Sequence, residues 1–360
     1  MNKNAICTIV SLNYFAQARG LLESVMKYNK EIDLYILIVD KIEDPQVKTN
    51  LEAFHEFPVH INYISDLKIE NIESMAFKYD LVEFNTALKP FYLEVLLNKY
   101  GYDSIIYLDS DILLFNNLHK VYKLLEENSI IITPHLISEE EDITTDISKI
   151  DDFLQYGVYN LGFIAIKNDK NGMELLRWWK EKLYNKCFLS SQDFLAWDQK
   201  WMDFAPALFE SVYVLKDPGY NVAFWNIQKR FITKKDDIFY VNEKYELVFY
   251  HFSHYRLSRP DIIAEMEQEE RCIRIADRPD LEELFQCYYN NVMKMDYNYY
   301  NRFTYGFSKF DNGEKIEKSY RIIYNRILHN TKKFGNPFIS SNENCFYNFI
   351  KDIDYAINRD

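Results

Sequence analysis

Short apolar runs alternate with amphipathic segments along the first hundred residues of the chain. Four of these runs have the length and composition of buried strands, at residues 5–10, 34–39, 60–64 and 104–108. The segments between them carry apolar residues at helical spacing, at residues 14–28, 44–57 and 85–100. This alternation predicts an α/β fold with a mostly parallel central sheet flanked by helices on both faces.

Beyond residue 130 the order of strands and helices is mixed. The pattern predicts strands at residues 130–133, 159–166, 212–215 and 247–250, and helices at residues 172–183 and 192–201. An acidic run, SEEEDITTDISKIDD at residues 138–152, is either a solvated loop or a mobile lid. After Pro260 the pattern turns helical, with helices expected at residues 261–276 and 281–293. We therefore expect a catalytic domain over residues 1–260 and a helical C-terminal extension over residues 261–360.

Composition and charge narrow the class of protein. Apolar residues make up 48% of the 360 residues, enough for a sizeable core in one large domain or two smaller ones. The formal net charge of −13 argues against a nucleic-acid partner, because phosphate backbones are held mainly by Lys and Arg. Five scattered cysteines without a CxxC spacing are typical of reduced thiols in a cytoplasmic protein, not of a disulfide framework or a zinc site.

Two segments bear on a membrane. The first apolar run ends before Asn13 and is too short for a secretion signal or a membrane span, so we expect a cytoplasmic protein. Residues 314–333 hold six Lys or Arg against two Glu, with apolar residues at helical spacing. This segment is either a helix docked on its own domain or a peripheral contact with the inner face of a membrane. The Lys-, Ile- and Asn-rich composition is typical of a bacterial protein.

The segment IIYLDSDILLF, at residues 105–115, places two aspartates at the end of a buried strand. Residues i and i+2 of a strand face the same side, so a strand continuing past Leu108 would point Asp109 and Asp111 together and Ser110 away. Two converging carboxylates suit a divalent cation, which in turn can bridge substrate phosphates. The alternative is a pair of solvated or capping aspartates, and the buried strand before them favours the metal site.

His251 is the third candidate metal ligand. It follows the apolar run LVFY much as Asp109 follows IIYL, so both side chains are expected at one edge of the sheet. One imidazole with two carboxylates fits Mn²⁺ better than Ca²⁺, with Mg²⁺ as the second choice. The alternative is a structural histidine.

Other polar residues are candidates for donor binding. Asp40 ends the second strand, where it can accept hydrogen bonds from a base or ribose, or it is an ordinary turn aspartate. Lys89 precedes a proline at a kink or helix start, where it can neutralise phosphate charge, or it is an exposed lysine. Asn160 and Gly162 lie on a strand beside the metal edge, where the amide could bond a sugar hydroxyl. The glycine there permits close backbone approach or serves packing alone.

Together these segments resemble the nucleotide-sugar glycosyltransferases with the GT-A fold, particularly those similar to glycosyltransferase family 8. YLDSDILLF resembles their DxD segment, and SLNYFAQARGLLESV, with Ser11 and Tyr14, resembles the turn where the nucleotide base and ribose sit. ALKP holds Lys89 at the place of a basic donor-site residue, and YNLGFIAI resembles the N-A-G strand, with Leu161 replacing the small residue. DQKWMD resembles the D-Q segment and HFSHY the late histidine motif, so the likeness covers about residues 6–260.

The resemblance also implies catalytic and phosphate-binding roles for particular residues. Asp198 and Gln199 of the D-Q segment would lie beneath the anomeric carbon and the acceptor as the catalytic pair, and Ser110 would at most contact the ribose. Family members have Gly where His254 stands, and that Gly permits close approach to the diphosphate. Arg256 and Arg259 could supply positive charge to the leaving diphosphate instead.

The segment GYNVAFWN, at residues 219–226, is either an acceptor-side surface or a buried strand. On the first interpretation Asn221, Trp225 and Asn226 face the acceptor, with the indole stacked on a sugar. On the second, Trp225 is a core residue.

The resemblance implies a metal-dependent glycosyltransferase that moves a sugar from a nucleoside-diphosphate donor, UDP-linked, to a hydroxyl acceptor. The acceptor would be a glycan or lipid-linked glycan, and the anomeric configuration would be retained. One alternative is a non-catalytic nucleotide- or sugar-binding protein of the same fold. The other is a haloacid-dehalogenase-like phosphatase, which Ile112 and Leu113 after the second aspartate disfavour.

Overall fold

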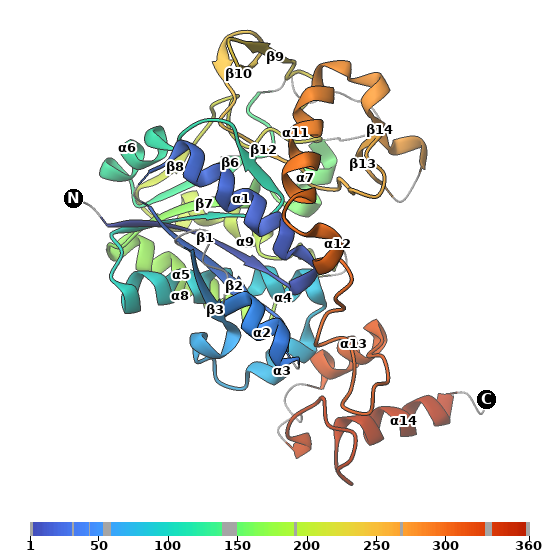
Figure 1. Cartoon of the computed structure of the whole chain (residues 1–360). Coiled ribbons are helices and arrows are strands. Elements are labelled where there is room, and N and C mark those ends of the chain that lie inside the picture. The colour runs from blue at the N-terminus through green and yellow to red at the C-terminus, as the bar shows by residue number, and fades with distance from the viewer. Residues whose placement is uncertain are drawn as a thin grey trace.

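The structure, a computed structural model, describes residues 3–30, 32–42, 44–52, 59–138, 150–190, 193–266, 269–327 and 333–357. Its centre is a seven-stranded sheet (Figure 1). In spatial order the strands are β3 (Val59–Tyr63), β2 (Asp33–Ile38), β1 (Asn4–Val10), β4 (Ser104–Leu108), β7 (Tyr159–Lys167), β6 (Ile130–Pro134) and β8 (Val212–Val214).

Most neighbouring strands of this sheet are parallel. β1 pairs in parallel with β2 and β4, β2 with β3, and β6 with β8, whereas β7 runs antiparallel to β4 and β6. The predicted α/β fold with a mostly parallel sheet and flanking helices is therefore confirmed. Because β1, β2 and β4 are parallel, their carboxyl ends meet at one edge of the sheet. β7 runs the other way and begins at that same edge.

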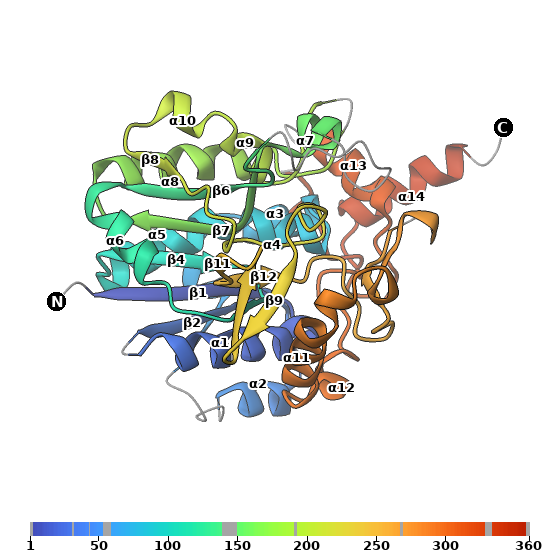
Figure 2. The ribbon, with the colours of Figure 1, turned by 90° about the horizontal axis from the view of Figure 1, so that it is seen from above.

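Alternation along the strands divides the core into two clusters, one on each face of the sheet. On β1, Ile6 and Val10 belong to one cluster and Cys7 and Ile9 to the other. The first face is covered by α1 (Phe15–Tyr28), α2 (Pro45–Glu52), α6 (His119–Glu127) and α11 (Glu282–Met293). The second is covered by α3 (Ile72–Lys78), α4 (Leu81–Ala87), α5 (Lys89–Tyr100) and α8 (Lys170–Leu183). Figure 2 shows α1 and α2 on one side of the sheet and α5 and α8 on the other.

The single helix expected at residues 85–100 is divided into α4 and α5. α4 begins with Asp80, whose side chain accepts from the amide of Glu83, while the Glu83 side chain bonds back to the Asp80 amide. Pro90 lies in the first turn of α5, where its missing N–H is not needed. Lys89 is therefore the first residue of a helix, which agrees with the predicted helix start and not with the predicted kink.

Two of the predicted helices are wrong. The helix expected at residues 192–201 is limited to α9 (Gln199–Met202), because Phe194 and Trp197 before it have φ of +54° and +47°. The helix expected at residues 261–276 is replaced by β13 (Ile262–Ala264), which pairs with β14 (Ile273–Arg274). β-Branched residues at these positions favour a strand over a helix.

Several elements were not predicted. They include α3, α6, β5 (Ile112–Leu114), α7 (Ile150–Tyr156), α10 (Ala205–Leu208) and the three-stranded sheet of β9 (Ile232–Lys235), β10 (Ile238–Val241) and β11 (Tyr245–Glu246). Residues 139–149 of the acidic run lie outside the described residues, so the choice between loop and lid stays open.

The chain after residue 260 packs on both faces of the sheet domain. On one face α11 lies against α1, where Gly20 leaves room for Asn291, because a Cβ on Gly20 would lie 2.2 Å from Asn291 Oδ1. α12 (Tyr297–Tyr300) follows on the same side. On the other face lies α13 (Lys318–Arg326), and α14 (Phe346–Ile357) is the last helix (Figure 1).

α13 is anchored by a buried arginine. The Arg321 guanidinium donates to the carbonyl oxygens of Ala76, Phe77 and Tyr79, at the end of α3, and to that of Phe307. Tyr320 and Tyr324 of the same helix are buried as well. These contacts agree with the docked alternative for the basic segment at residues 314–333. Among the described residues, no helix is long and apolar enough to cross a membrane.

Candidate active site

The site lies at the carboxyl end of β4, in the turn that carries Asp109 and Asp111. β4 ends at Leu108, and the Ile112 amide donates to the Asp109 carbonyl oxygen at 3.1 Å. The strand therefore does not continue through Asp111, because this hydrogen bond closes a turn. β5 leaves the turn and pairs antiparallel with β12 (Phe249–His251), with His251 opposite Ile112. This pairing brings His251 to the two aspartates.

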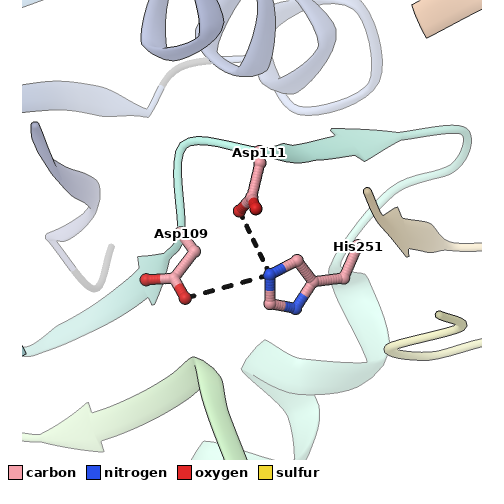
Figure 3. A group of neighbouring side chains, drawn as sticks. All are labelled: Asp109, Asp111 and His251. Carbon is pink, nitrogen blue, oxygen red and sulfur yellow. Dashed lines mark ion pairs between the residues drawn. The ribbon is translucent and has the colours of Figure 1, made fainter. Parts of the chain in front are cut away.

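Figure 3 shows the three side chains converging. Nε2 of His251 lies 3.1 Å from Asp111 Oδ1 and 3.9 Å from Asp109 Oδ2. One ligand atom from each residue lies within 4.8 Å of the others. Burial alone would lower the pKa of His251, but the Asp111 carboxylate raises it above its ordinary value. Burial alone would raise the pKa of Asp111, and the imidazole lowers it.

This group is open to a cation from one side. The His251 side chain is 5% exposed, whereas those of Asp109 and Asp111 are 29% and 27% exposed. A buried imidazole and two partly exposed carboxylates form a donor set that suits Mn²⁺ or Mg²⁺. The residues present therefore fit the divalent cation expected from the sequence.

Lys89 is buried at the centre of the acidic residues. Its Nζ lies 2.9 Å from Asp198 Oδ2 and 3.4 Å from Asp109 Oδ1, and it donates to the Leu161 carbonyl oxygen at 2.9 Å. Burial alone would lower the pKa of Lys89, but the two carboxylates raise it above its ordinary value. The Tyr107 hydroxyl also donates to Asp109 Oδ1, at 2.6 Å. The charge of Lys89 is thus directed at carboxylates of the protein and not at an open phosphate position.

Asp198 and Gln199 lie at the start of α9, behind this lysine. Asp198 is buried, and burial raises the pKa of its carboxyl group, although Lys89 limits the rise. Nε2 of Gln199 donates to the Tyr156 carbonyl oxygen at 2.9 Å and so ties α9 to the end of α7. The structure places Asp198 in contact with the site through Lys89.

Asn160 and Gly162, on β7, lie beside His251 of the metal-ligand group. Oδ1 of Asn160 accepts from the Gly162 amide and from Nδ2 of Asn221, each at 3.1 Å. Gly162 is required by a close approach, because a Cβ there would lie 2.5 Å from Cε1 of His251. The sequence had suggested close backbone approach to a substrate, and here the close neighbour is the imidazole.

Asp40 lies farther along the same sheet edge. Its carboxylate accepts from the Leu12 amide at 2.6 Å and from the Gly306 amide at 2.7 Å. Burial raises the pKa of Asp40 to about 6, although these two hydrogen bonds oppose the rise. Both oxygens therefore hold backbone groups of the protein, and one of these belongs to the C-terminal extension.

Ser11, Tyr14 and Ser110 were expected to contact the nucleotide. Ser11 and Tyr14 follow β1, and Ser110 lies between the two aspartates. Ser11 is buried, and its hydroxyl donates to Asn13 Oδ1 at 2.5 Å. Tyr14 is 44% exposed, and burial of its hydroxyl together with the charge of Asp111 raises its pKa. Ser110 is nearly buried in the turn between the two aspartates.

The arginines after His251 are held by acidic residues. Arg256 pairs with Glu265, and Arg259 pairs with Glu265 at 2.8 Å and with Glu269 at 3.1 Å. His254 has φ of +64°, in the left-handed region that favours glycine. The backbone at His254 thus has a conformation that glycine adopts more readily than histidine.

Three residues of the site region have roles that sequence reasoning missed or left open. Trp225 is a buried residue whose ring packs edge-on to His251, with centroids 5.3 Å apart, so it is a core residue and not an exposed stacking surface. Asn226 is buried too, and it donates to the His135 carbonyl oxygen at 3.2 Å. His135 was not predicted, and a lone histidine after a strand gives no signal of its contacts.

Comparison with known proteins gives two curated relatives, both from Bacillus subtilis (strain 168). Uncharacterized protein YfnF is 25% identical over 291 residues, which cover 79% of this chain and 90% of YfnF. Uncharacterized protein YfnD is 25% identical over 260 residues, which cover 69% of this chain and 77% of YfnD. No family model matches the chain.

Solved structures with a similar chain course include three glycosyltransferases. Galactosyltransferase LgtC, in complex with donor and acceptor sugar analogs, has a TM-score of 0.41 and 14% identity, covering 61% of this chain and 76% of LgtC. The bifunctional WbbM has a TM-score of 0.46 and 14% identity, covering 82% of this chain and 51% of WbbM. Mouse xyloside xylosyltransferase 1 has a TM-score of 0.41 and 14% identity, covering 69% of this chain and 97% of that enzyme. All three TM-scores are below 0.5, so we base the fold on the sheet order and the function on the site geometry.

Gly162→Ala is expected to displace His251. The added methyl group would lie 2.5 Å from Cε1 and 2.7 Å from Nδ1 of the ring, so the imidazole must leave its present position beside the aspartates. We expect the Mn²⁺ affinity, measured by isothermal titration calorimetry, to fall at least about tenfold.

The matched control is Gly101→Ala, at φ +70° with no heavy atom within 4 Å of the new Cβ. It should lose about 1 kcal/mol of stability through backbone strain and keep its Mn²⁺ affinity. Unchanged Mn²⁺ affinity in Gly162→Ala would contradict the role of His251 as a ligand.

Asp40 makes a pH-dependent contribution to stability. Its folded-state pKa of about 6 is above the ordinary value of 3.8, so the folded protein binds this proton more tightly than the unfolded chain. Stability from this group is therefore full below pH 4 and falls as the pH rises towards 6.

Asp40→Asn removes the titration, so the free energy of unfolding of the variant relative to wild type should rise by about 1–3 kcal/mol over that range. Chemical denaturation at several pH values measures this difference, with Asp277→Asn, an exposed aspartate, as the control variant. A pH-independent difference for Asp40→Asn would refute this contribution.

Proposed function

We propose that this chain is a metal-dependent glycosyltransferase that moves a sugar from a nucleoside-diphosphate donor, UDP-linked, to a hydroxyl acceptor. The observation that supports it is the convergence of Asp109, Asp111 and His251 at the carboxyl end of β4. Ligands of α/β sheets bind at such strand ends. We assign the GT-A fold and glycosyltransferase family 8 on the ordered motif segments, with which the mostly parallel sheet agrees.

In this proposal Asp109, Asp111 and His251 hold Mn²⁺, or Mg²⁺ in its place. The bound cation would neutralise the diphosphate of the donor and stabilise it as the leaving group. Tyr14, Ser11 and Ser110 would line the nucleotide end of the site. The charge of Asp111 raises the pKa of the Tyr14 hydroxyl and that of Arg256 lowers it, so both groups lie close enough to Tyr14 to support this assignment.

Lys89 would hold the carboxylates of the site in place and would not contact the donor. Its ammonium group fixes Asp109 between Lys89 and Tyr107, so the other oxygen of Asp109 is left for the cation. Asp198 and Gln199 are proposed as the catalytic pair near the anomeric carbon, with retention of configuration. Asp198 would stabilise positive charge that develops there, because Lys89 keeps its carboxylate oriented.

Arg256 and Arg259 are proposed to reach the leaving diphosphate by exchanging an acidic partner for a phosphate. Their side chains are 69% and 39% exposed, so both are accessible to a ligand. Guanidinium groups bind phosphate and carboxylate with the same fork geometry. The acceptor would be a glycan or lipid-linked glycan. α13 stays docked through Arg321, and its exposed basic side chains, Lys318 and Arg326, would make the peripheral contact with an anionic membrane.

The second candidate function is a non-catalytic nucleotide- or sugar-binding protein of the same fold. A His251 remote from the aspartates would favour it, whereas the observed distance to Asp111 is 3.1 Å. Donor turnover distinguishes the two functions, since both would bind nucleotide.

Thermal unfolding with UDP and Mn²⁺ tests the proposal. Ligand at about 100 times its Kd stabilises the folded state by about 2.7 kcal/mol, so Tm should rise by several degrees. Asp111→Asn should abolish the shift because it removes a ligand charge, while the exposed Asp277→Asn should keep it. If neither UDP nor GDP shifts Tm with Mn²⁺ present, the proposal fails. A shift without hydrolysis of any common UDP- or GDP-sugar would favour the non-catalytic alternative.

A further inference from the structure

A buried polar network lies behind the acidic turn. His135 follows β6 and Asn160 lies on β7, and both are less than 10% exposed. The His135 ring stacks on Phe153 of α7, with centroids 4.6 Å apart. Trp225 packs edge-on against both His135 and His251, with centroid separations of 5.3 Å in each case. The network therefore extends from α7 to the candidate metal ligand.

The hydrogen-bond partners determine which atoms of this network donate. Nδ1 of His135 lies 3.2 Å from the Val158 carbonyl oxygen, which only accepts, so Nδ1 carries the proton. Nε2 of His135 is then an acceptor, 3.4 Å from Nδ2 of Asn160. Oδ1 of Asn160 faces the other way and accepts from the Gly162 amide and from Asn221. A flipped Asn160 amide would set donor against donor at Gly162.

The same oxygen of Asn160 borders His251. A Cβ on Gly162 would lie 2.7 Å from Nδ1 of His251 and 2.9 Å from Oδ1 of Asn160, so both atoms face one small space. Nδ1 of His251 is buried without a hydrogen-bond partner in the part of the chain that the structure describes. A histidine that binds a metal through Nε2 carries its proton on Nδ1 and normally donates it to an oxygen.

We propose that His135 and Asn160 are positioning residues that fix the ring of His251 with Nε2 toward Asp109 and Asp111. His135 sets the orientation of the Asn160 amide, and when a cation is bound the amide oxygen accepts a hydrogen bond from the Nδ1–H group of His251 in place of the one from Nδ2 of Asn221. Gly162 keeps the space between them open. This role rests on the proposed metal site, and it gives Asn160 a function other than the sugar contact expected from the sequence.

The test measures the Mn²⁺ affinity of the full chain from the electron paramagnetic resonance signal of free Mn²⁺, without any donor. Asn160→Leu removes the amide, whereas Asn160→Asp keeps an oxygen toward His251. His135→Phe keeps a ring to stack on Phe153 but removes the acceptor that orients Asn160. His119→Phe is the matched control, since His119 is exposed on α6.

We expect Asn160→Leu and His135→Phe to raise the Mn²⁺ Kd about 10–100-fold. Asn160→Asp should bind at least as tightly as wild type, and His119→Phe should be unchanged. If Asn160→Leu does not fold, His135→Phe and Asn160→Asp decide the question.

Two failures are distinguishable. If wild type binds Mn²⁺ and His135→Phe binds it equally well, or if Asn160→Asp is as weak as Asn160→Leu, the positioning role is wrong and the metal site stands. If wild type itself does not bind Mn²⁺, the metal site fails, and the positioning role fails with it.

Discussion

The buried ammonium group of Lys89 joins two carboxylates, those of Asp109 and Asp198, at the end of the sheet. Carboxylates beside a buried strand are costly to ionise unless a positive partner meets them, and removal of one partner of a buried pair typically costs about 3–5 kcal/mol. Lys89 occupies the first turn of α5, and its third contact is the Leu161 carbonyl oxygen on β7. One side chain thus connects α5, β4, β7 and α9 and sets the geometry of the acidic centre.

With Lys89 and Tyr107 at one oxygen of Asp109, the other oxygen of Asp109 and the carboxylate of Asp111 are left for a metal cation. Lys89 and Tyr107 hold one oxygen of Asp109, while the other faces His251. The antiparallel pairing of β5 with β12 fixes how far His251 lies from the turn, and Gly162 lets the ring lie close to β7. The candidate metal position is thus defined by backbone pairing as well as by side chains, which reduces the reorganisation that binding requires.

The C-terminal extension is built into the same framework. Asp40 accepts from the Gly306 amide at the sheet edge. Arg321 donates to four carbonyl oxygens on the face of the sheet that α3, α4, α5 and α8 cover. Phe285 and Tyr288 of α11 belong to one core cluster, and Tyr320 and Phe346 belong to the other. Residues after 260 therefore complete both cores. The C-terminal extension is thus physically connected to the edge of the sheet where the ligands are expected.

Local patterns were sufficient to predict the strands around the site. Apolar runs predict β1, β2 and β4 to within a residue. The polar residues that follow the apolar runs IIYL and LVFY predict that Asp109, Asp111 and His251 lie together. The contacts that decide individual roles depend on partners far along the chain. Lys89 meets Asp198 over a separation that no periodicity reveals, and His135 meets Asn160 only because β6 and β7 pair. The helices expected at residues 192–201 and 261–276 failed for a related reason, since positive φ angles and a strand pairing override helical spacing there.

The most direct test of this account is anomalous X-ray scattering at the manganese absorption edge, from crystals grown with Mn²⁺ and UDP. The account predicts one strong peak between the carboxylates of Asp109 and Asp111 and Nε2 of His251, with phosphate oxygens of UDP against it. A peak at other residues, or UDP bound at the carboxyl end of the sheet without a peak between these three side chains, would contradict it.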